Sequence, residues 1–414
     1  MIKALSPVQR PATTEQFSLH RDEFMRALPI PAGTFTAESF HPYPVIVSAD
    51  EYRQMARIQR ALYRGINAVV SHYFTDSRIR DIIRLSEEET SLLREVVGQQ
   101  CRVGTYRPDF LYDACGNIQI CEINARFSSN GYVISQYLKM GQRLQYLPKN
   151  VQPKAHCDGG NYLRAFINRL DSSLPVFIVK GRESGGEIHF LCSELNNAGY
   201  SCRFIQPSQL KEALATHDKA SCILELHQDE ILDPANRASI LEMARRWNYF
   251  NDLRTILIAH DKRMLAVFHR EDIMRDYLEA GDAGLLREHV APTYVLQEDS
   301  PQLSDALSNR AEWLVKPIRS GKGEGIVLGK STDQETWARC LDKPQHEGYV
   351  LQRYIGQSRI SMIEAVGNQV FDVPMNVVGL MLCFENEFLG PGVYRASASD
   401  VVNVASGGLI VNAI

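Results

Sequence analysis

The pattern of hydrophobic and polar residues separates a helical first quarter of the chain from a longer part in which strands appear. Apolar residues recur at helical spacing over residues 49–73 and 77–97, as on one face of an amphipathic helix. Two short apolar-rich runs follow, over residues 107–112 and 118–124, and turn-forming residues separate them. We therefore predict a mainly helical N-terminal region followed by a β-hairpin.

From Pro175 onward, short apolar runs alternate with amphipathic segments. The predicted elements are strands over residues 176–180, 201–205, 222–226 and 255–259, and helices over residues 187–198, near Gln209 and over residues 235–247. This alternation is typical of a small parallel α/β unit. Beyond Asp261 the chain is rich in strands and glycines, which indicates a further lobe. The predicted division is a helical region (1–95), a hairpin unit (96–160), an α/β unit (161–260) and a C-terminal unit (261–414).

The composition is that of a multidomain globular protein. A chain of 414 residues is longer than one hydrophobic core usually serves. Its 44% hydrophobic and 23% charged residues exclude the disordered and fibrous classes. The formal net charge of −4 provides no general attraction to nucleic acid or to an anionic membrane, so we expect neither as a partner. The oligomeric state stays open.

The cysteines and the apolar runs indicate a cytoplasmic protein. The nine cysteines are odd in number and scattered, with no Cys-x-x-Cys pair, so neither disulfides nor a structural zinc is expected. The first residues lack the apolar stretch of a secretion signal. The longest apolar run, about residues 377–384, is far shorter than the ~20 residues that cross a bilayer.

The predicted hairpin brings two carboxylates and an amide to one face. With a four-residue turn over residues 114–117, Asp109 pairs with Glu122 and Arg107 pairs with Asn124. All four share a face because strand side chains alternate. Opposed carboxylates lie about 5 Å apart between Cβ atoms and repel, unless a cation lies between them. Such hard oxygen ligands suit Mg²⁺, which often also binds substrate phosphates. The alternative is a solvated face whose charges point to water.

Lys316 ends an apolar strand and precedes a glycine-rich turn over residues 321–325. Successive backbone N–H groups in such a turn can bind phosphate, although the lysine of a Walker loop follows its glycines instead. The alternative is a mobile hairpin tip. Lys262 and the strand over residues 349–355 also have plain alternatives, as a surface helix residue and as a core strand.

Together these fragments resemble the ATP-grasp superfamily of carboxylate ligases. Asp261-Lys262 is similar to the family's first nucleotide lysine, and Lys316 with its glycine turn is similar to the second lysine and its phosphate loop. Residues 350–355 are similar to the linker that contacts adenine, although Gln352 stands where the family often has a carboxylate. The resemblance implies an ATP-grasp fold of α/β lobes, with ATP as a co-substrate.

The hairpin resembles the magnesium hairpin of this family, as found in D-alanine:D-alanine ligase. In the usual order the hairpin follows the lysines, whereas here it precedes them. The resemblance therefore implies a circularly permuted chain, with the motif order of glutathionylspermidine synthase, and a small Rossmann-like parallel α/β domain. Arg395 and Asn403 lie in a segment similar to the one that precedes the hairpin in unpermuted members. We expect this segment to lie against the hairpin.

The resemblance also implies roles for individual residues. The implied Mg²⁺ ligands are Asp109, Glu122 and Asn124, and the implied catalytic residues are Arg107, Lys316 and Arg395. The residues implied to bind ATP are Lys262, Lys316, Ser320, Gly321, Gly323, Gly325, Gln352, Arg353, Tyr354 and Ile355. The candidates for holding the substrate carboxylate are Arg126, Ser128, Ser129, Asn130 and Asn403.

The implied reaction joins two small molecules. A carboxylate, expected to be an amino acid or peptide-like, attacks the γ-phosphate of MgATP to give ADP and an acyl phosphate, which an amine converts to an amide with release of phosphate. The electrostatic demands of phosphoryl transfer suit the cationic residues above. Three alternatives remain. They are a kinase that stops at phosphoryl transfer, a protein that binds nucleotide or metabolite without ligating, and a nicotinamide-linked enzyme. The last is disfavoured because residues 181–186 lack the dinucleotide fingerprint.

Overall fold

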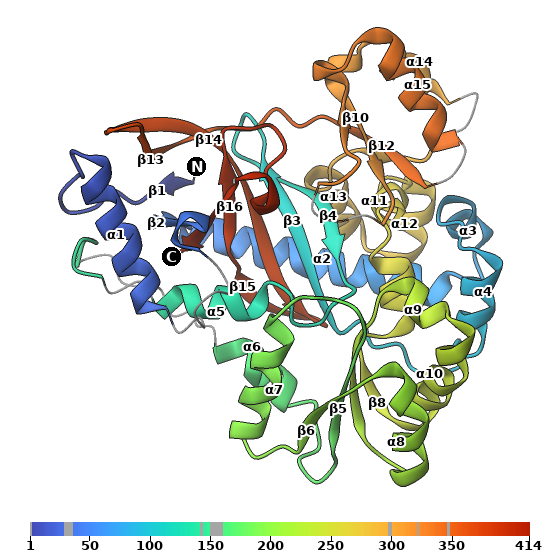
Figure 1. Cartoon of the computed structure of the whole chain (residues 1–414). Helices are drawn as coiled ribbons and strands as arrows, with labels where there is room; N and C mark the ends of the chain where they lie inside the picture. The colour runs from blue at the N-terminus through green and yellow to red at the C-terminus, as the bar shows by residue number, and fades with distance from the viewer. Residues whose placement is uncertain are drawn as a thin grey trace.

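Three β-sheets, each with its own helices, organise the described part of the chain (Figure 1). The computed structural model describes residues 2–28, 36–140, 144–149, 160–296, 300–319, 321, 323–345 and 348–414. Within these ranges, none of the helices combines the length and the apolar character needed to cross a membrane.

The largest sheet joins strands from distant parts of the chain. Its order is β1 (Lys3–Ala4), β2 (Phe40–Ile46), β17 (Leu409–Ala413), β16 (Tyr394–Ser397), β14 (Gln369–Phe384), β3 (Thr105–Tyr112) and β4 (Ile118–Asn124), with β13 (Ile360–Val366) and β15 (Glu387–Pro391) also paired to β14. β14 pairs with both β3 and β16. β14 thus separates β16 from β3, and the Arg395 side chain of β16 reaches Asp109 of the hairpin across it, which confirms the predicted contact at Arg395.

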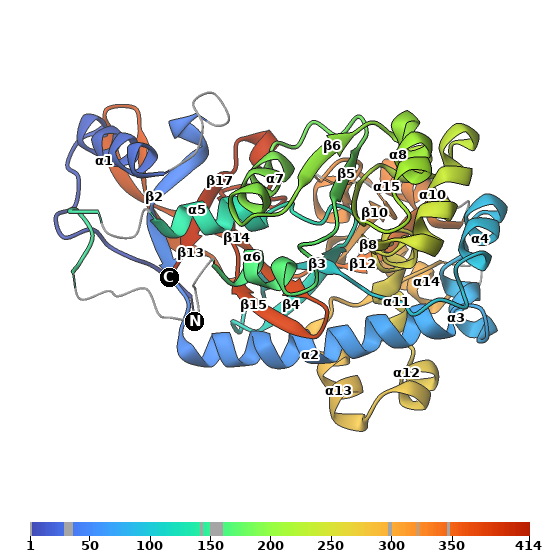
Figure 2. The same ribbon diagram turned by 90° about the horizontal axis from the view of Figure 1, so that it is seen from below.

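The long helix α2 (Ala49–His72) runs along one face of this sheet (Figure 2). It begins at a capping box, in which the Ser48 hydroxyl accepts the N–H of Glu51 and the Glu51 carboxylate accepts the N–H of Ser48. The apolar stripe of the helix includes Met55 and Ile58, which are buried in one core with Phe110 of β3. The helix therefore packs in the same core as the hairpin and supports it.

Two features of the first 95 residues differ from the sequence-based expectation. The single helix predicted over residues 77–97 is wrong, because the Ser86 side chain caps a new helix. The result is two helices, α3 (Ser77–Ile82) and α4 (Glu87–Arg94). The second difference is β2, a strand that was not predicted between α1 (Thr14–Ala27) and α2. The strand contains two prolines, and because it is buried along most of its length it lacks the alternation of polar and apolar residues that indicates a strand.

The α/β unit has a four-stranded parallel sheet in the order β6 (Cys202–Ile205), β5 (Val176–Lys180), β7 (Ser221–Glu225) and β8 (Asn248–Phe250). Its helices are α6 (Gly160–Ile167), α7 (Glu187–Asn197), α8 (Leu210–Thr216), α9 (Gln228–Leu232) and α10 (Pro234–Arg246). The strand predicted over residues 255–259 is wrong, because Thr255–Ala259 is a π-helical turn. All five of its residues are buried, and a short, fully buried apolar run does not distinguish strand from helix.

The third sheet is small and antiparallel, in the order β11 (Val327–Leu328), β10 (Trp313–Pro317), β12 (Tyr349–Arg353) and β9 (Thr293–Tyr294). Two helices, α14 (Pro301–Ser308) and α15 (Gln334–Gln345), pack on it around the buried side chain of Trp337. The remaining helices are α5 (Tyr132–Met140), α11 (Arg263–Phe268), α12 (Glu271–Tyr277) and α13 (Ala280–His289).

Asn251 joins the α/β unit to the hairpin. This buried side chain follows β8, and its Nδ2 donates to the carbonyl oxygens of Thr105 at 2.8 Å and Ala125 at 3.0 Å. Its Oδ1 accepts the N–H of Thr105 at 2.9 Å. These bonds fix the start of β3 and the end of β4 against the parallel sheet, and so position the loop that follows the hairpin.

Candidate active site

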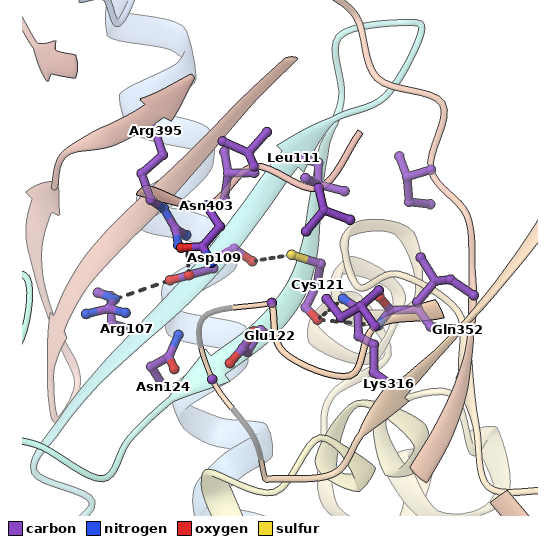
Figure 3. A pocket seen from close by; sticks show the side chains of 18 of the residues that line it. Arg107, Asp109, Leu111, Cys121, Glu122, Asn124, Lys316, Gln352, Arg395 and Asn403 are labelled. Atoms are coloured by element: carbon purple, nitrogen blue, oxygen red, sulfur yellow. Dashed lines mark hydrogen bonds and ion pairs between the residues drawn. The ribbon is translucent and has the colours of Figure 1, made fainter. Parts of the chain in front are cut away.

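A cavity of about 360 Å³ lies between the hairpin, the small antiparallel sheet and the loop after β16. Most of the predicted site residues line it, although they come from separate parts of the chain. They are Arg107, Asp109, Glu122, Asn124, Arg126, Asn130, Lys316, Gly321, Gly323, Gln352, Arg353, Tyr354, Ile355, Arg395 and Asn403. Figure 3 shows how the labelled members of this set point toward one another.

The hairpin has the predicted register where it matters for the site. Asp109 lies opposite Glu122, and Arg107 lies opposite Asn124. The turn is one residue longer than predicted, because Tyr112 rather than Asp113 pairs with Ile118. A β-bulge next to Asp109 and Phe110 leaves Cys121 as an extra residue on β4 and compensates for the longer turn. The face that carries the carboxylates is therefore preserved.

Asp109 is buried between two arginines. Its carboxylate accepts from Arg107 Nε at 3.2 Å and from Arg395 Nη2 at 2.5 Å. Burial alone would raise the pKa of Asp109, but the charges of Arg395 and Arg107 hold it below its ordinary value. Arg107 also donates to the backbone oxygen of Asn130 at 2.8 Å. Asp109 thus fixes both guanidinium groups at the floor of the cavity.

Glu122 and Asn124 complete the oxygen donors on this face. Glu122 pairs with Lys262 at 3.4 Å, which brings that lysine to the cavity although it does not line it. Among the described residues, no group of three or more His, Cys, Asp or Glu could hold a metal ion by itself. Two carboxylates with one amide nevertheless suit Mg²⁺, because this ion usually keeps waters and phosphate oxygens as further ligands. The donor set therefore fits the implied ion.

The bulge directs a backbone carbonyl toward the side of the cavity that the small antiparallel sheet forms. The oxygen of Cys121 accepts from Lys316 Nζ and from Gln352 Nε2, each at 3.4 Å (Figure 3). Gln352 also donates to Thr293 Oγ1 at 2.8 Å. Lys316 and Gln352, at 6% and 2% exposure, come from neighbouring strands of the small sheet. Burial raises the pKa of the Cys121 thiol to about 11, so this cysteine is not a nucleophile at neutral pH.

The glycine turn closes the cavity on one side. Gly321 and Gly323 line it, Gly325 packs against Pro317 instead, and Ser320 lies outside the described residues. Gly323 has a φ of +72°, and a Cβ there would meet Val401 at 3.1 Å. The turn therefore lies against the loop that carries Asn403, and at Gly323 both the positive φ and the close contact with Val401 disfavour a side chain.

The linker after β12 is held by bonds on both sides. The backbone N–H groups of Arg353 and Tyr354 donate to Pro292 and Glu312 at 2.8 Å each. The Arg353 side chain pairs with Asp305 at 3.0 Å. Tyr354 and Ile355 face the cavity.

The predicted carboxylate-binding loop divides between two cavities. Arg126 lines the first, and burial lowers the pKa of its guanidinium. Ser129 lines a second cavity, and Asn130 lines both. Ser128 lines neither, because its hydroxyl and N–H both donate to Glu225 at 3.2 Å. Arg126 Nε and Arg395 Nε are buried without a hydrogen-bond partner in the described part of the chain.

Several cavity residues were not singled out from the sequence. Apolar side chains form one wall, namely Leu111, Leu314, Ile326, Leu328 and Val378. Asp400 pairs with Lys330 at 2.7 Å and accepts from Tyr354 at 3.1 Å, which ties the linker to the large sheet. His260 also lines the cavity, and burial with the charges of Arg126 and Lys262 holds its pKa well below the ordinary value. Only their position in the folded chain reveals these residues.

Comparison with known proteins is consistent with an ATP-grasp fold for this chain. Residues 58–258 match the model of the AnkG N-terminal domain family, and residues 243–357 match that of the tubulin-tyrosine ligase family. The chain is 22% identical over 440 residues to "ATP-grasp enzyme ankG" of Aspergillus thermomutatus, covering 91% of this chain and 89% of that relative.

One solved structure shares the fold over nearly its whole length. A glutathione synthetase-like effector (GSS30) from Globodera pallida, in its apo form, superposes with a TM-score of 0.61 at 11% identity, and the match covers 96% of each chain. D-cycloserine synthetase DcsG matches with a TM-score of 0.30 at 11% identity, over 58% of this chain and 90% of that one, which is too low for an argument. The matches as a whole support the ATP-grasp superfamily and, in general terms, an ATP-dependent ligase.

Proposed function

We propose that the protein joins a carboxylate to an amine through an acyl phosphate, with ATP converted to ADP and phosphate. The observation that carries this proposal is the convergence of Lys316, Arg107 and Arg395 on one cavity, beside a hairpin with three oxygen donors. These cations are of the kind that stabilises the charge on a transferring phosphoryl group. No side-chain nucleophile is required for either step.

Two buried donors support the binding of anions in this cavity. Arg126 Nε and Arg395 Nε lack hydrogen-bond partners within the described residues, and a buried donor without a partner costs free energy. A substrate carboxylate or a phosphate would satisfy them. Arg395 is held by Asp109, so its free Nε–H has a fixed direction. We assign Arg126, with Asn130 beside it, to the substrate carboxylate.

The hairpin would hold Mg²⁺ through Asp109, Glu122 and Asn124. When bound, the ion would neutralise phosphate charge and orient the terminal phosphate. The glycine turn would cover the phosphates and exclude water, which protects an acyl phosphate from hydrolysis. The apolar wall with Tyr354 and Ile355 offers a surface for the nucleotide base.

We also propose that the chain is a circularly permuted member of its superfamily. The adjacency of β16, β14 and β3 supports this order, because Arg395 reaches Asp109 across 286 positions of sequence. In any chain with this permuted order of motifs, we expect the strands that correspond to β16, β14 and β3 to be neighbours in one sheet.

The proposal is tested by measuring ADP release with pools of carboxylic acids, with and without pools of amines. Amine-dependent turnover is expected. Hydroxylamine in place of the amine should trap the activated acid as a hydroxamate. Turnover that needs no amine and yields a stable phosphorylated product would identify a kinase, and the absence of turnover with every pool would identify a binding protein. Formation of AMP would exclude the acyl phosphate route.

A further inference from the structure

A second cavity, of about 160 Å³, opens beside the first. Phe127, Asn130 and Glu183 line both cavities, so the two adjoin at this point. Helices α5 and α7 form its walls. The remaining lining residues are Ser129, Val133, Ile134, Tyr137, Gly185, Gly186, Glu187, Ile188, Phe190 and Glu225.

The charged groups that line this cavity are all acidic. In the described part of the chain, none of its lining residues is a lysine, arginine or histidine. Two of its three carboxylates have local partners. Glu187 accepts the N–H groups of three residues at the start of α5, at 2.9 to 3.1 Å. Glu183 pairs with His227 at 3.0 Å.

Glu225 is different, because one of its oxygens has no partner. The residue ends β7 and is 3% exposed. Its Oε1 accepts both bonds from Ser128, whereas within the described residues nothing donates to Oε2. Oε2 is not among the enclosed polar atoms of the described residues, so it is open to the cavity and can accept a hydrogen bond from a ligand. An unsatisfied acceptor in an acidic cavity is suited to a donor that carries positive charge.

Apart from the three carboxylates, Ser129 and Asn130, apolar side chains and glycines line the cavity. Val133, Ile134 and Ile188 are almost fully buried, and the rings of Tyr137 and Phe190 meet edge to face at 5.3 Å between centroids. An apolar cavity of about 150 Å³ is large enough for benzene. A single aromatic ring or a branched aliphatic group would therefore fill this space.

We propose that the second cavity binds the amine substrate, as an ammonium group beside Glu225 with an aromatic or branched apolar body between α5 and α7. The shared residues Phe127 and Asn130 place this amine next to the first cavity, where the acid is activated. Acidic amines are disfavoured by the charge of Glu183 and by that of Glu225, which becomes ionised when an ammonium group binds beside it. This inference rests on the proposed ligase function.

The protonation of Glu225 provides a specific signature of such binding. Burial raises the pKa of Glu225 to about 8, against the opposing effect of its bonds from Ser128. The other charged or titratable groups that face it are Lys180, Glu183, Arg126 and Tyr162. A cation at Oε2 favours the ionised carboxylate. Binding at pH 7 should therefore release a proton.

The test is calorimetric titration of the full chain with phenethylamine and its isosteres 2-phenylethanol and phenylacetate. We expect phenethylamine to bind at least tenfold more tightly than the alcohol, with proton release seen as a dependence of the binding enthalpy on the buffer. Phenylacetate, whose carboxylate the first cavity would accept, should not displace phenethylamine in a competition titration. Glu225→Gln should remove both the preference and the proton release. Glu212→Gln, an exposed change on α8, should alter neither.

A second variant does not disturb a buried group. A Cβ at Gly186 would meet no atom within 4 Å, and its φ of −85° is ordinary. Gly186→Lys should weaken phenethylamine and strengthen phenylacetate. Equal binding of the three probes, or no binding of phenethylamine at millimolar concentration, would overturn the assignment. An amine-dependent turnover whose amine KM is unchanged in both variants would also overturn it. Selective phenethylamine binding without any ADP formation would instead refute the ligase proposal and leave an amine-binding cavity.

Discussion

Replacing Lys316 by methionine distinguishes the effect of this lysine on the stability of the fold from its effect on the rate of the reaction. The side chain is 6% exposed, and its ammonium donates to the Cys121 oxygen at the long distance of 3.4 Å. Within the described residues, no carboxylate forms an ion pair with it. A buried ammonium with so little compensation destabilises a protein. Lys316→Met keeps the length of the apolar stem and leaves Gln352 as a donor to the same oxygen.

The expected loss of activity follows from the charge that the lysine supplies. A unit charge that acts over about 4 Å at an effective dielectric constant of about 20 contributes ~4 kcal/mol. Removing one group that stabilises transition-state charge typically lowers kcat about 100- to 1,000-fold. We therefore expect ADP release and hydroxamate formation to fall together by this factor.

The stability of the variant is predicted not to fall with its activity. In the absence of ligand, the melting temperature of Lys316→Met should equal or exceed that of the wild type. Lys211→Met, at an exposed position of α8, serves as the control and should change neither quantity. Near wild-type turnover, or a melting temperature several degrees lower, would refute the reasoning that this lysine acts on the phosphate and is tolerated by the fold.

Three further predictions follow from the site. Asp109→Asn should lower both ADP formation and the melting temperature, since two half-buried arginines lose their shared partner. Glu122→Gln should lower Mg²⁺-dependent turnover with little effect on the melting temperature. At pH 7.5, iodoacetamide should modify the exposed Cys115 and spare the buried Cys121, because burial raises the pKa of the Cys121 thiol to about 11. Mass spectrometry of the native protein would show which cysteine is modified. Rapid modification of Cys121 would contradict this prediction. Burial raises the pKa of Glu225 from 4.5 to about 8, so its stabilising contribution is present below about pH 4.5 and is lost as the pH rises to about 8. The melting temperature of Glu225→Gln relative to wild type should therefore rise between pH 5 and pH 8, and a constant difference would disprove the shift.

Much of the site could be predicted because its signals are local. The alternation of side chains along β3 and β4 is sufficient to place Asp109 opposite Glu122. Lys316 is the fourth residue of β10 and precedes a turn with two glycines at positive φ. Strand β5 has the predicted bounds, residues 176–180, since a buried parallel strand is a continuous apolar run between breaks.

Other features depend on contacts between distant segments. The sequence of β2 includes two prolines, and its pairing partner β17 is more than 360 residues away. The π-helical turn at residues 255–259 was mistaken for a strand because every residue is buried. The bulge at Cys121 is likewise invisible in the sequence, because only the longer turn makes it necessary. Glu225 could be recognised as the end of a strand, but its free oxygen depends on Ser128 from another unit.

The large sheet pairs strands from distant parts of the sequence, and this determines the order in which the protein can fold during synthesis. The β3–β4 hairpin leaves the ribosome early, yet the edge of β3 that pairs with β14 waits for residues 369–384. Strand β17 lies between β2 and β16, so the sheet stays divided until residues 409–413 emerge. The α/β unit has no such dependence, because its strands lie within residues 176–250. Sheets built from non-local pairs fold slowly and expose strand edges meanwhile. A nascent chain therefore carries a folded α/β unit beside an open sheet, and the unpaired edge of β3 is where premature association with other chains would begin.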